Sequence, residues 1–405
     1  MSELLCFTPE PSYFTLEHFN TLMLFLHHKQ VSDITIQSGE AILTEKDGLL
    51  HHVTHRRITH QELSDFINHI YGANASALIQ SGVDLDTSYQ LNTPEYSVRF
   101  RVNITACLFR GYHGTQVTLR VINSHPPELK DMGLDDQLTQ YLNGLKGVVV
   151  ISGATGSGKS TLLASLIRSF VEDENNHLKV LTYESPIEYT YDHINKPNSI
   201  VSQSEIPRHL PNFAAGVRNA LRRKPGLILL GEARDGETIS AVIEAALTGH
   251  PVYTTVHANG AIDTLRRMLN ATSQANRSDT YYDLISTIEL VLWQALVPKC
   301  GGGRIPIREY LYMSPSIKEK LLSTQPEAMN TVLQKLLVES GQPLSRDVKL
   351  KWVKNLITKE TAMRYLPEMR SDHDNNLGGN KMLFMDNDSY GRDEFLSKAH
   401  TGTGV

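Results

Sequence analysis

Residues 153–161 combine side-chain types whose spacing suits phosphate binding. Glycine permits backbone conformations that turn successive N–H groups towards one anion, and the N-terminus of a following helix adds a favourable potential. A lysine can then reach the β- and γ-phosphates, and the hydroxyl after it can ligate Mg²⁺. The spacing predicts a nucleotide site with ATP and Mg²⁺ as cofactors. Its phosphate-binding residues are Gly153, Ala154, Thr155, Gly156, Ser157, Gly158, Lys159, Ser160 and Thr161.

The residues around this loop have the pattern of a strand before it and a helix after it. Residues 148–151 form an uninterrupted aliphatic run, which is typical of a buried strand. Residues 162–170 place their apolar side chains on one helical face. A glycine-rich turn that merely precedes Lys-Ser does not need this setting, so the strand–loop–helix pattern favours a phosphate loop.

Three further short runs with the pattern of strands each end at a polar side chain of catalytic type. In open α/β sheets ligands bind outside the carboxyl ends of the strands, so we expect these side chains to line one crevice. The runs and the residues that follow them are 180–183 with Glu184 and Glu188, 227–230 with Glu232, and 252–256 with His257.

Glu232 is the first candidate for the catalytic base, because a preceding strand can hold it rigidly against the attacking water. We expect Glu184 and Glu188 to order Mg²⁺ through its water shell, and Ser160, Glu184 and Glu232 to form the metal site. His257 is expected to contact the γ-phosphate. The alternatives are a surface charge or helix cap for the carboxylates and a hydrogen-bonded core histidine for His257.

Four arginines precede the phosphate loop on segments that alternate like strands. Arg99 and Arg101 lie two residues apart on one strand face, and Arg110 and Arg120 follow on later segments. One interpretation is a solvated strand face. The other is that a neighbouring subunit inserts arginines at the phosphates, where a planar cation accelerates phosphoryl transfer by roughly 10³ to 10⁵. Activity would then depend on assembly.

Composition narrows the class of protein. The chain has 405 residues, 40% of them hydrophobic, which allows two or three domains of roughly 150 residues each. Its formal net charge of −5 makes nucleic acid improbable as a direct ligand. Three widely separated cysteines predict neither a zinc module nor a disulfide framework, and fit a reducing cytoplasm. No apolar run is long enough to cross a bilayer, so we expect membrane association only through partners.

Changes of pattern along the chain predict its domains. We expect an α+β domain over residues 1–122 and, after a proline-containing linker at 123–127, an α/β domain over 128–312 with a parallel sheet covered on both faces. A helical region over 313–368 and a flexible tail over 369–405 complete the prediction.

Individual elements are predicted within these domains. In the first domain we expect strands over 31–37 and 96–102 and one clear helix from about His60 to Tyr71. After residue 312 we expect two or three polar helices, one of them around Val348 to Ile357.

In this order, the motifs resemble the type II/type IV secretion ATPase superfamily, which includes pilus-retraction ATPases, and most closely its DotB and TraJ branch of type IVB secretion and conjugation. The resemblance covers roughly residues 30–312. Besides the phosphate loop, it is carried by Val31-Ser-Asp33, Arg99-Phe-Arg-Val-Asn103, Glu184-Ser-Pro-Ile-Glu188, Gly231-Glu-Ala-Arg-Asp235, Thr248-Gly-His250 through Asn259, and Gln294-Ala-Leu-Val-Pro298.

The resemblance implies a PAS-like N-terminal domain joined to a RecA-like ATPase domain. It also implies a homo-hexamer that hydrolyses ATP at subunit interfaces and works with inner-membrane components of a secretion or conjugation machine. The implied site residues are Glu232 in the Walker B role, Glu184 and Glu188 in the acidic box, His250 and His257 in the histidine box, and Arg99, Arg101 and Arg110 approaching the nucleotide.

The chain departs from the family pattern at three places. Ser185 replaces the usual aspartate of the acidic box, residues 224–226 replace Asp-Pro-Asp, and Ala295 replaces the arginine of Gln-Arg-Leu. The first two bear on metal coordination. A pilus motor of the same fold, a RecA-like nucleic-acid translocase and a small-molecule kinase remain alternative interpretations, and the lack of a four-cysteine module argues against the type II branch.

Overall fold

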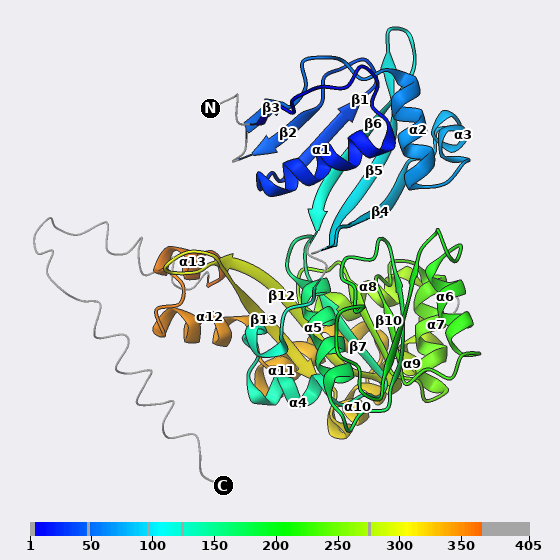
Figure 1. Ribbon diagram of the computed structural model, residues 1–405. Coiled ribbons are helices and arrows are strands. Elements are labelled where there is room, and N and C mark those ends of the chain that lie inside the picture. Colours follow the sequence, from blue (N-terminus) through cyan, green and yellow to red (C-terminus); the bar gives the residue numbers. More distant parts are fainter. Residues whose placement is uncertain (1–4, 47–48, 95–96, 123–124, 274–276, 367–405) are drawn as a thin grey trace, which may run out of the picture. The chain divides into compact units, whose positions relative to one another are not determined.

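A computed structural model describes residues 5–46, 49–94, 97–122, 125–273 and 277–366 (Figure 1). These residues form a mixed α/β fold with one six-stranded and one seven-stranded sheet. The chain divides into two compact units, one of residues 1–149, 160–255 and 271–273, and the other of residues 150–159, 256–270 and 274–405.

The six-stranded sheet is antiparallel at each of its pairings, in the order β3-β2-β1-β6-β5-β4. Ile34 and Ile36 of β1 are buried between less buried neighbours, so one face of the strand meets the core. The strands are β1 (Asp33–Gln37), β2 (Leu43–Lys46), β3 (Leu49–His52), β4 (Leu85–Asn92), β5 (Ser97–Phe109) and β6 (Tyr112–Ile122).

Three α-helices accompany this sheet, where the sequence analysis expected one: α1 (Leu16–His28), α2 (His60–Ile70) and α3 (Ala75–Gln80). The expected helix from His60 is α2, which ends one residue earlier than expected. Helix α1 was missed, although Phe19, Met23 and Leu26 have helical spacing and are buried. The aromatic rings of Phe19 and Phe66 stack with their centroids 4.3 Å apart, which joins α1 to α2 in one core.

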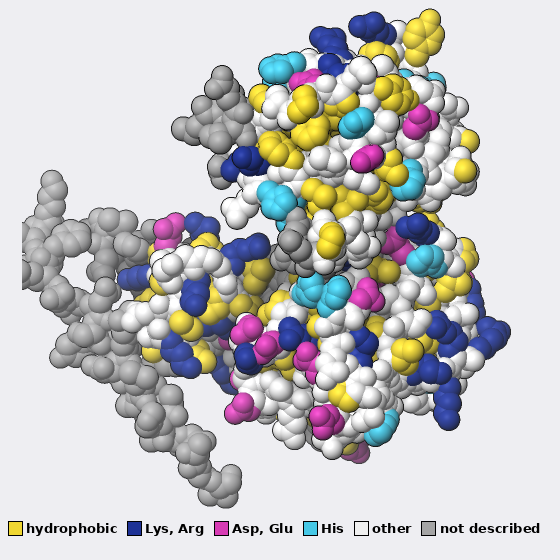
Figure 2. Space-filling model, viewed as in Figure 1, with side chains coloured by type: hydrophobic (Ala, Val, Ile, Leu, Met, Phe, Trp, Pro, Cys, Tyr) yellow, Lys and Arg dark blue, Asp and Glu magenta, His cyan; other side chains and the backbone are white. Residues whose placement is uncertain are grey.

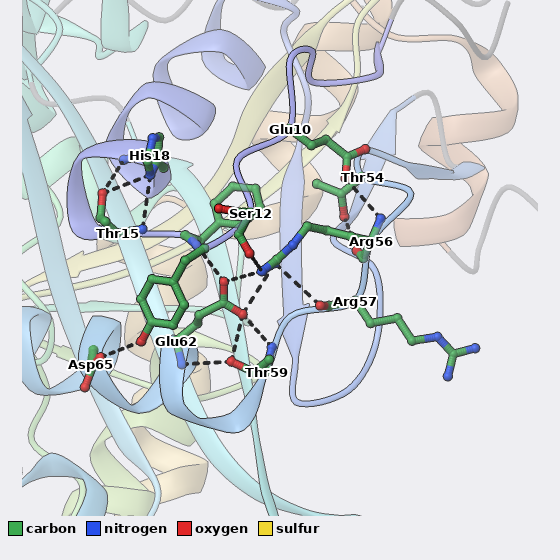
Figure 3. A network of polar contacts seen from close by, with 12 residues as sticks. Glu10, Ser12, Thr15, His18, Thr54, Arg56, Arg57, Thr59, Glu62 and Asp65 are labelled. Atoms are coloured by element: carbon green, nitrogen blue, oxygen red, sulfur yellow. Dashed lines mark hydrogen bonds and ion pairs between the residues drawn. The ribbon is translucent and has the colours of Figure 1, made fainter.

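A buried carboxylate holds the start of α2 (Figure 3). The side chain of Glu62 is 0% exposed and receives the backbone N–H groups of Phe14 at 2.6 Å and Thr59 at 2.8 Å. The Arg56 guanidinium lies 2.5 Å from the same carboxylate. Glu62 therefore closes the capping box of α2 and also anchors the chain segment that leads into α1.

The seven-stranded sheet has the order β13-β12-β7-β11-β10-β8-β9. Strands β8, β9, β10 and β11 pair in parallel, as expected, but β12 and β13 form an antiparallel hairpin. The expected parallel sheet therefore carries an antiparallel hairpin at this edge. The strands are β7 (Val148–Ser152), β8 (Lys179–Glu184), β9 (Ile200–Glu205), β10 (Leu227–Leu230), β11 (Val252–Val256), β12 (Ile288–Pro298) and β13 (Arg304–Tyr312).

Helices lie between these strands and continue after them. Among the described residues, four α-helices follow β13, more than the two or three expected, and the one expected to begin at Val348 begins at Leu344. Before β7 lie η2 (Leu129–Met132) and α4 (Asp136–Leu142). Between the strands lie α5 (Lys159–Glu172), α6 (Phe213–Ala220), α7 (Gly236–Leu247), α8 (Ala261–Ala271) and α9 (Arg277–Thr287). After β13 lie α10 (Pro315–Leu322), η4 (Pro326–Ala328), α11 (Met329–Ser340), α12 (Leu344–Val353) and α13 (Lys359–Tyr365).

The predicted domain boundaries remain predictions. Residues 123 and 124 of the expected linker and the whole expected tail at 369–405 lie outside the described residues. Among the described residues, no helix has the length and apolar character needed to cross a membrane.

Candidate nucleotide-binding site

The phosphate loop connects β7 to α5, as the sequence analysis expected. Every residue of β7 is buried, which fixes the point at which the loop begins. Gly153, Gly156 and Gly158 have φ values of 147°, 76° and 83°, a region that side chains other than glycine rarely occupy. The Lys159 ammonium lies 2.9 Å from both the Gly153 and Ala154 carbonyl oxygens, so the loop closes around its own cation.

Buried residues of the β12–β13 hairpin support this loop. The Gln294 side chain, 3% exposed, donates from Nε2 to the Ser157 carbonyl oxygen at 2.7 Å. A Cβ at Gly153 would lie 2.2 Å from the Gln294 carbonyl oxygen, and one at Gly158 would lie 3.1 Å from Nε2. The first of these distances leaves no room for a side chain at Gly153, so this glycine serves packing as well as backbone conformation.

The loop has the groups that a phosphate needs. The Ser157 hydroxyl is buried and has no hydrogen-bond partner, which costs free energy unless a ligand supplies one. The Lys159 ammonium and the N-terminus of α5 add positive potential beside it. Ser160, one residue further on, is exposed and so available to a metal ion. These residues fit a magnesium nucleotide.

Strands β8 and β10 bring the candidate carboxylates to one edge. They pair in parallel, so Glu184 and Glu232 lie at or just beyond neighbouring carboxyl ends. The Gly231 N–H donates to the Tyr183 carbonyl oxygen at 2.7 Å, and a Cβ at Gly231 would lie 3.2 Å from that oxygen. Glycine therefore lets the two strand ends approach closely. The Ala233 N–H donates to Thr255 of β11 at 2.9 Å, which holds the other side of the Glu232 turn.

Glu184 is a carboxylate in a poorly solvated position. Thr182 Oγ1 donates to Glu184 Oε1 at 2.6 Å, and Gln203 Nε2 donates to the same oxygen at 3.1 Å. Removal from water outweighs these two donors, and the nearby Glu188 charge adds to the effect, so the pKa of Glu184 is raised to about 7. The carboxylate is thus costly to ionise without a cation nearby.

The acidic loop after β8 is held by an arginine expected to act elsewhere. The Arg99 side chain, 3% exposed, donates to the carbonyl oxygens of Ile187 at 2.8 Å and Glu188 at 3.1 Å. It also donates to Ser88 Oγ at 3.2 Å. Arg99 is therefore engaged with its own chain in this structure, and its approach to a nucleotide of another subunit stays a prediction.

The end of the phosphate loop is linked to the same acidic loop. Thr161 Oγ1 and the Tyr189 hydroxyl are 2.9 Å apart, and the Tyr189 carbonyl oxygen accepts from Gln203 Nε2 at 2.8 Å. Since Gln203 also contacts Glu184, one amide joins the loop backbone to the carboxylate. Sequence reasoning missed Gln203 and Tyr189, because neither belongs to a motif and β9 lacks an aliphatic run.

The three candidate arginines are not brought together. Arg99 and Arg101 lie on the same face of β5, whereas Arg110 follows the end of that strand, roughly 30 Å away along it. Arg101 is 42% exposed and pairs with Asp86 at 3.4 Å. Arg110 stacks its guanidinium over the Phe109 ring at 5.4 Å. The structure therefore separates Arg110 from the other two arginines along β5, and the approach of any of the three to a nucleotide stays a prediction.

The two histidines of the histidine box are also separated. His250 precedes β11 and His257 follows it, so the strand places them roughly 20 Å apart. His250 Nδ1 lies 3.1 Å from Thr248 Oγ1, at the amino end of the strand. His257 is exposed at the carboxyl end, and its carbonyl oxygen accepts from Arg267. The structure thus places the two histidines at opposite ends of β11, and the phosphate-binding role of each stays a prediction.

Comparisons with known proteins indicate the family and the fold of this chain. The family model described as Type II/IV secretion system protein matches residues 17–336. The solved structure of the Legionella pneumophila ATPase DotB is similar over 89% of this chain and 98% of its own, with 47% sequence identity and a TM-score of 0.84.

Two pilus-retraction proteins are more distantly similar. A solved structure of the pilus retraction motor PilT with bound ADP matches 85% of this chain and 96% of its own, with 27% identity and a TM-score of 0.71. The type IV pilus retraction ATPase PilT of Pseudomonas aeruginosa is 28% identical over 84% of this chain and 96% of its own length.

Proposed function

The chain belongs to the type II/IV secretion system protein family, and we propose that it hydrolyses ATP to power a type IVB-like secretion or conjugation machine. The observation that carries the proposal is the phosphate loop, whose closed backbone, Lys159 and unpartnered Ser157 hydroxyl suit a bound nucleotide. The likeness to DotB over most of both chains favours a type IVB role over the others in the family.

The residues divide the work of hydrolysis between binding and activation of water. Lys159 and the loop N–H groups, from Gly153 to Thr161, hold the phosphates, and Ser160 binds the metal. Glu232 takes the position of the base that orients the attacking water, since the end of β10 holds it rigidly. His257 lies beyond β11, in the place of a γ-phosphate contact.

Magnesium would be held by Ser160 directly and by Glu184, Glu188 and Glu232 through water, and when bound it neutralises charge on the β- and γ-phosphates. Glu184 suits this part because Thr182 and Gln203 fix its Oε1 while burial disfavours its charge. A divalent cation beside it restores the ionised form. Ser185, in place of the family's aspartate, leaves one carboxylate fewer in this group.

We further propose that the active form is a homo-hexamer in the cytoplasm that docks on inner-membrane components of its machine. We assign the approach to a neighbouring subunit to Arg101, whose side chain is 42% exposed and whose surface ion pair with Asp86 contributes little. Arg99 instead supports the acidic loop within its own chain. Nucleic acid is not proposed as a direct ligand. Figure 2 shows Lys and Arg in several separate groups among acidic and apolar side chains on the face that it draws.

The direct test is an ATPase assay of two variants, one at the residue proposed to bind the phosphates and one at the residue proposed to activate the attacking water. Lys159→Ala removes the phosphate cation and Glu232→Gln removes the base, so we expect each to lower kcat by at least about a hundredfold. Lys159→Ala should also weaken ADP binding, whereas Glu232→Gln should not. Wild-type hydrolysis in both variants, or no ADP binding by the wild-type protein, would reject the proposal.

A pilus-retraction motor is the second candidate, because the similarity to PilT spans most of both chains. The chemistry would be the same, so the machine rather than the site separates the two functions. Deleting the gene and measuring protein secretion, conjugative transfer and twitching motility separately distinguishes them. Loss of motility alone would favour the pilus motor.

A further inference from the structure

We propose that the β12–β13 hairpin is a clamp that positions two nucleotide-binding segments and couples them to helix α12. The proposal rests on the proposed function, because it assigns positioning residues to the same site. The two segments are the phosphate loop and residues 257–261, which follow β11. The residues that form the clamp are the cross-strand pairs Gln294 with Arg308 and Trp293 with Glu309.

The first pair holds the phosphate loop. Arg308, 5% exposed, donates from Nε to Gln294 Oε1 at 2.8 Å. Because a guanidinium can only donate, it fixes which end of the Gln294 amide is oxygen and turns the NH₂ group towards Ser157. That group donates to the Ser157 carbonyl oxygen at 2.7 Å. Arg308 therefore orients the amide that supports the loop.

The second pair holds the segment that begins with His257. Trp293 Nε1 donates to the Ala258 carbonyl oxygen at 3.0 Å, and Glu309 Oε1 accepts the Ala261 N–H at 2.8 Å. Successive strand residues point to opposite faces, so one hairpin face serves the phosphate loop and the other serves this segment. A small shift of the hairpin would move both segments together.

Strand β13 also carries the chain that enters α12. Tyr310 and Gln342 exchange backbone hydrogen bonds of 3.0 and 2.8 Å. The Arg308 N–H donates to Asp347 Oδ2 at 2.8 Å, and Lys351 pairs with the same carboxylate at 2.5 Å. Arg308 thus binds α12 through its backbone and Gln294 through its side chain. Nucleotide binding and the docking of α12 share this residue, so we infer that each favours the other.

Binding of MgADP to the full chain, measured by calorimetry, tests the clamp. Gln294→Glu keeps an acceptor for Arg308 but replaces the donor to Ser157 with an oxygen, so we expect binding about five- to tenfold weaker. Arg308→Met leaves the amide unoriented and should weaken binding in the same direction. Thermal unfolding by circular dichroism shows whether each variant is folded. If Arg308→Met does not fold, Gln294→Glu alone tests the clamp.

The matched controls separate this proposal from the proposed function. If wild-type protein does not bind MgADP, the proposed function fails, and the clamp, which rests on it, fails with it. If wild type binds, Lys159→Ala does not, and folded Gln294→Glu binds like wild type, then the clamp is wrong while the nucleotide site stands.

Hydrogen exchange tests the coupling to α12. We expect MgADP to slow exchange of residues 344–353 in wild type, and Gln294→Glu to reduce that protection at saturating nucleotide.

The affinity for MgADP tests the same coupling from the side of α12. Asp347→Ala should weaken MgADP binding by about fivefold, because coupling between two sites is reciprocal. Thr358→Ala, which removes the N-cap of α13 instead, should leave binding unchanged. Faster exchange in α12 of Asp347→Ala with unchanged MgADP affinity would overturn the coupling.

Discussion

Glu184 is a residue whose ionised form is disfavoured by its surroundings in the folded protein. Its carboxylate has two donors on one oxygen, yet burial raises its pKa to about 7. The folded state therefore holds a proton that the unfolded chain releases near pH 4.5. Stability attributable to this proton is lost as pH rises from about 4.5 to about 7, and above that range the ionised group destabilises the fold.

Replacing Glu184 by glutamine should remove this cost. The amide oxygen of Glu184→Gln can still accept from Thr182 and Gln203, so the local hydrogen bonds survive. In buffer with EDTA we expect the variant to be more stable than wild type by at most about 3 kcal/mol at pH 8, and nearly equal at pH 4.5. Urea unfolding at both pH values measures the difference. A gain of equal size at both would show that the ionised form is not disfavoured.

Glu62 differs from Glu184 because its buried carboxylate is paired with a cation, Arg56, and accepts hydrogen bonds from several donors. Removing it in Glu62→Ala leaves the Arg56 charge and the Thr59 and Phe14 N–H groups without their acceptor. We expect a loss of about 3 to 5 kcal/mol in the free energy of unfolding. Glu62→Gln, which keeps one acceptor oxygen, should lose less, and Asp65→Ala at the exposed Tyr13 contact is the control. Equal losses in the three variants would contradict this account.

At the scale of the element, the phosphate loop is shaped by its own glycines and by the hairpin beside it. Gly156 has a positive φ with open space around its Cα, whereas Gly153 has a positive φ and the Gln294 carbonyl oxygen in the way. The first residue needs glycine for its backbone alone. The second needs it for packing as well, so two glycines of the same motif are required for different reasons.

Matched alanine substitutions separate these two requirements. Gly156→Ala should cost about 1 kcal/mol through backbone strain. Gly153→Ala should cost more, because its Cβ would lie 2.2 Å from the Gln294 carbonyl oxygen and must move the loop or β12. We expect Gly153→Ala to show the larger fall in melting temperature and the larger loss of MgADP affinity. Similar melting temperatures in calorimetry would mean that the loop and hairpin separate without cost.

At the scale of the whole molecule, the proposed assembly predicts shared active sites. If one subunit supplies the phosphate loop and its neighbour supplies Arg101, neither Lys159→Ala nor Arg101→Ala alone forms a complete interface. In a mixed ring, an Arg101→Ala subunit with an intact loop can lie beside a Lys159→Ala subunit with an intact arginine.

An equimolar mixture of the two inactive variants should therefore recover about a quarter of wild-type ATPase activity, since about one interface in four is intact on random mixing. The activity of the wild type should also rise more steeply than in proportion to protein concentration, in parallel with hexamer formation seen by light scattering. A mixture of Lys159→Ala with Glu232→Gln, both assigned to one subunit's site, is the control and should stay inactive. No recovery in the first mixture would exclude Arg101 from the shared site.

Local patterns in the sequence determined the strand, loop and helix around the candidate phosphate loop. The glycine spacing, Lys159 and the aliphatic run before Glu232 predicted the phosphate loop, its strand and helix, and the mixed α/β class, because phosphate binding constrains neighbouring residues of one segment. Only the tertiary structure decided which distant residues support that chemistry. Gln294 and Arg308 lie on a hairpin that the sequence analysis did not predict beside the phosphate loop. Arg99, predicted to approach a nucleotide, donates to the acidic loop of its own chain. Such contacts depend on strand order and register, which bring Gln294 to Ser157 across 137 positions and Arg99 to Ile187 across 88, and they leave no periodic signal in the chain.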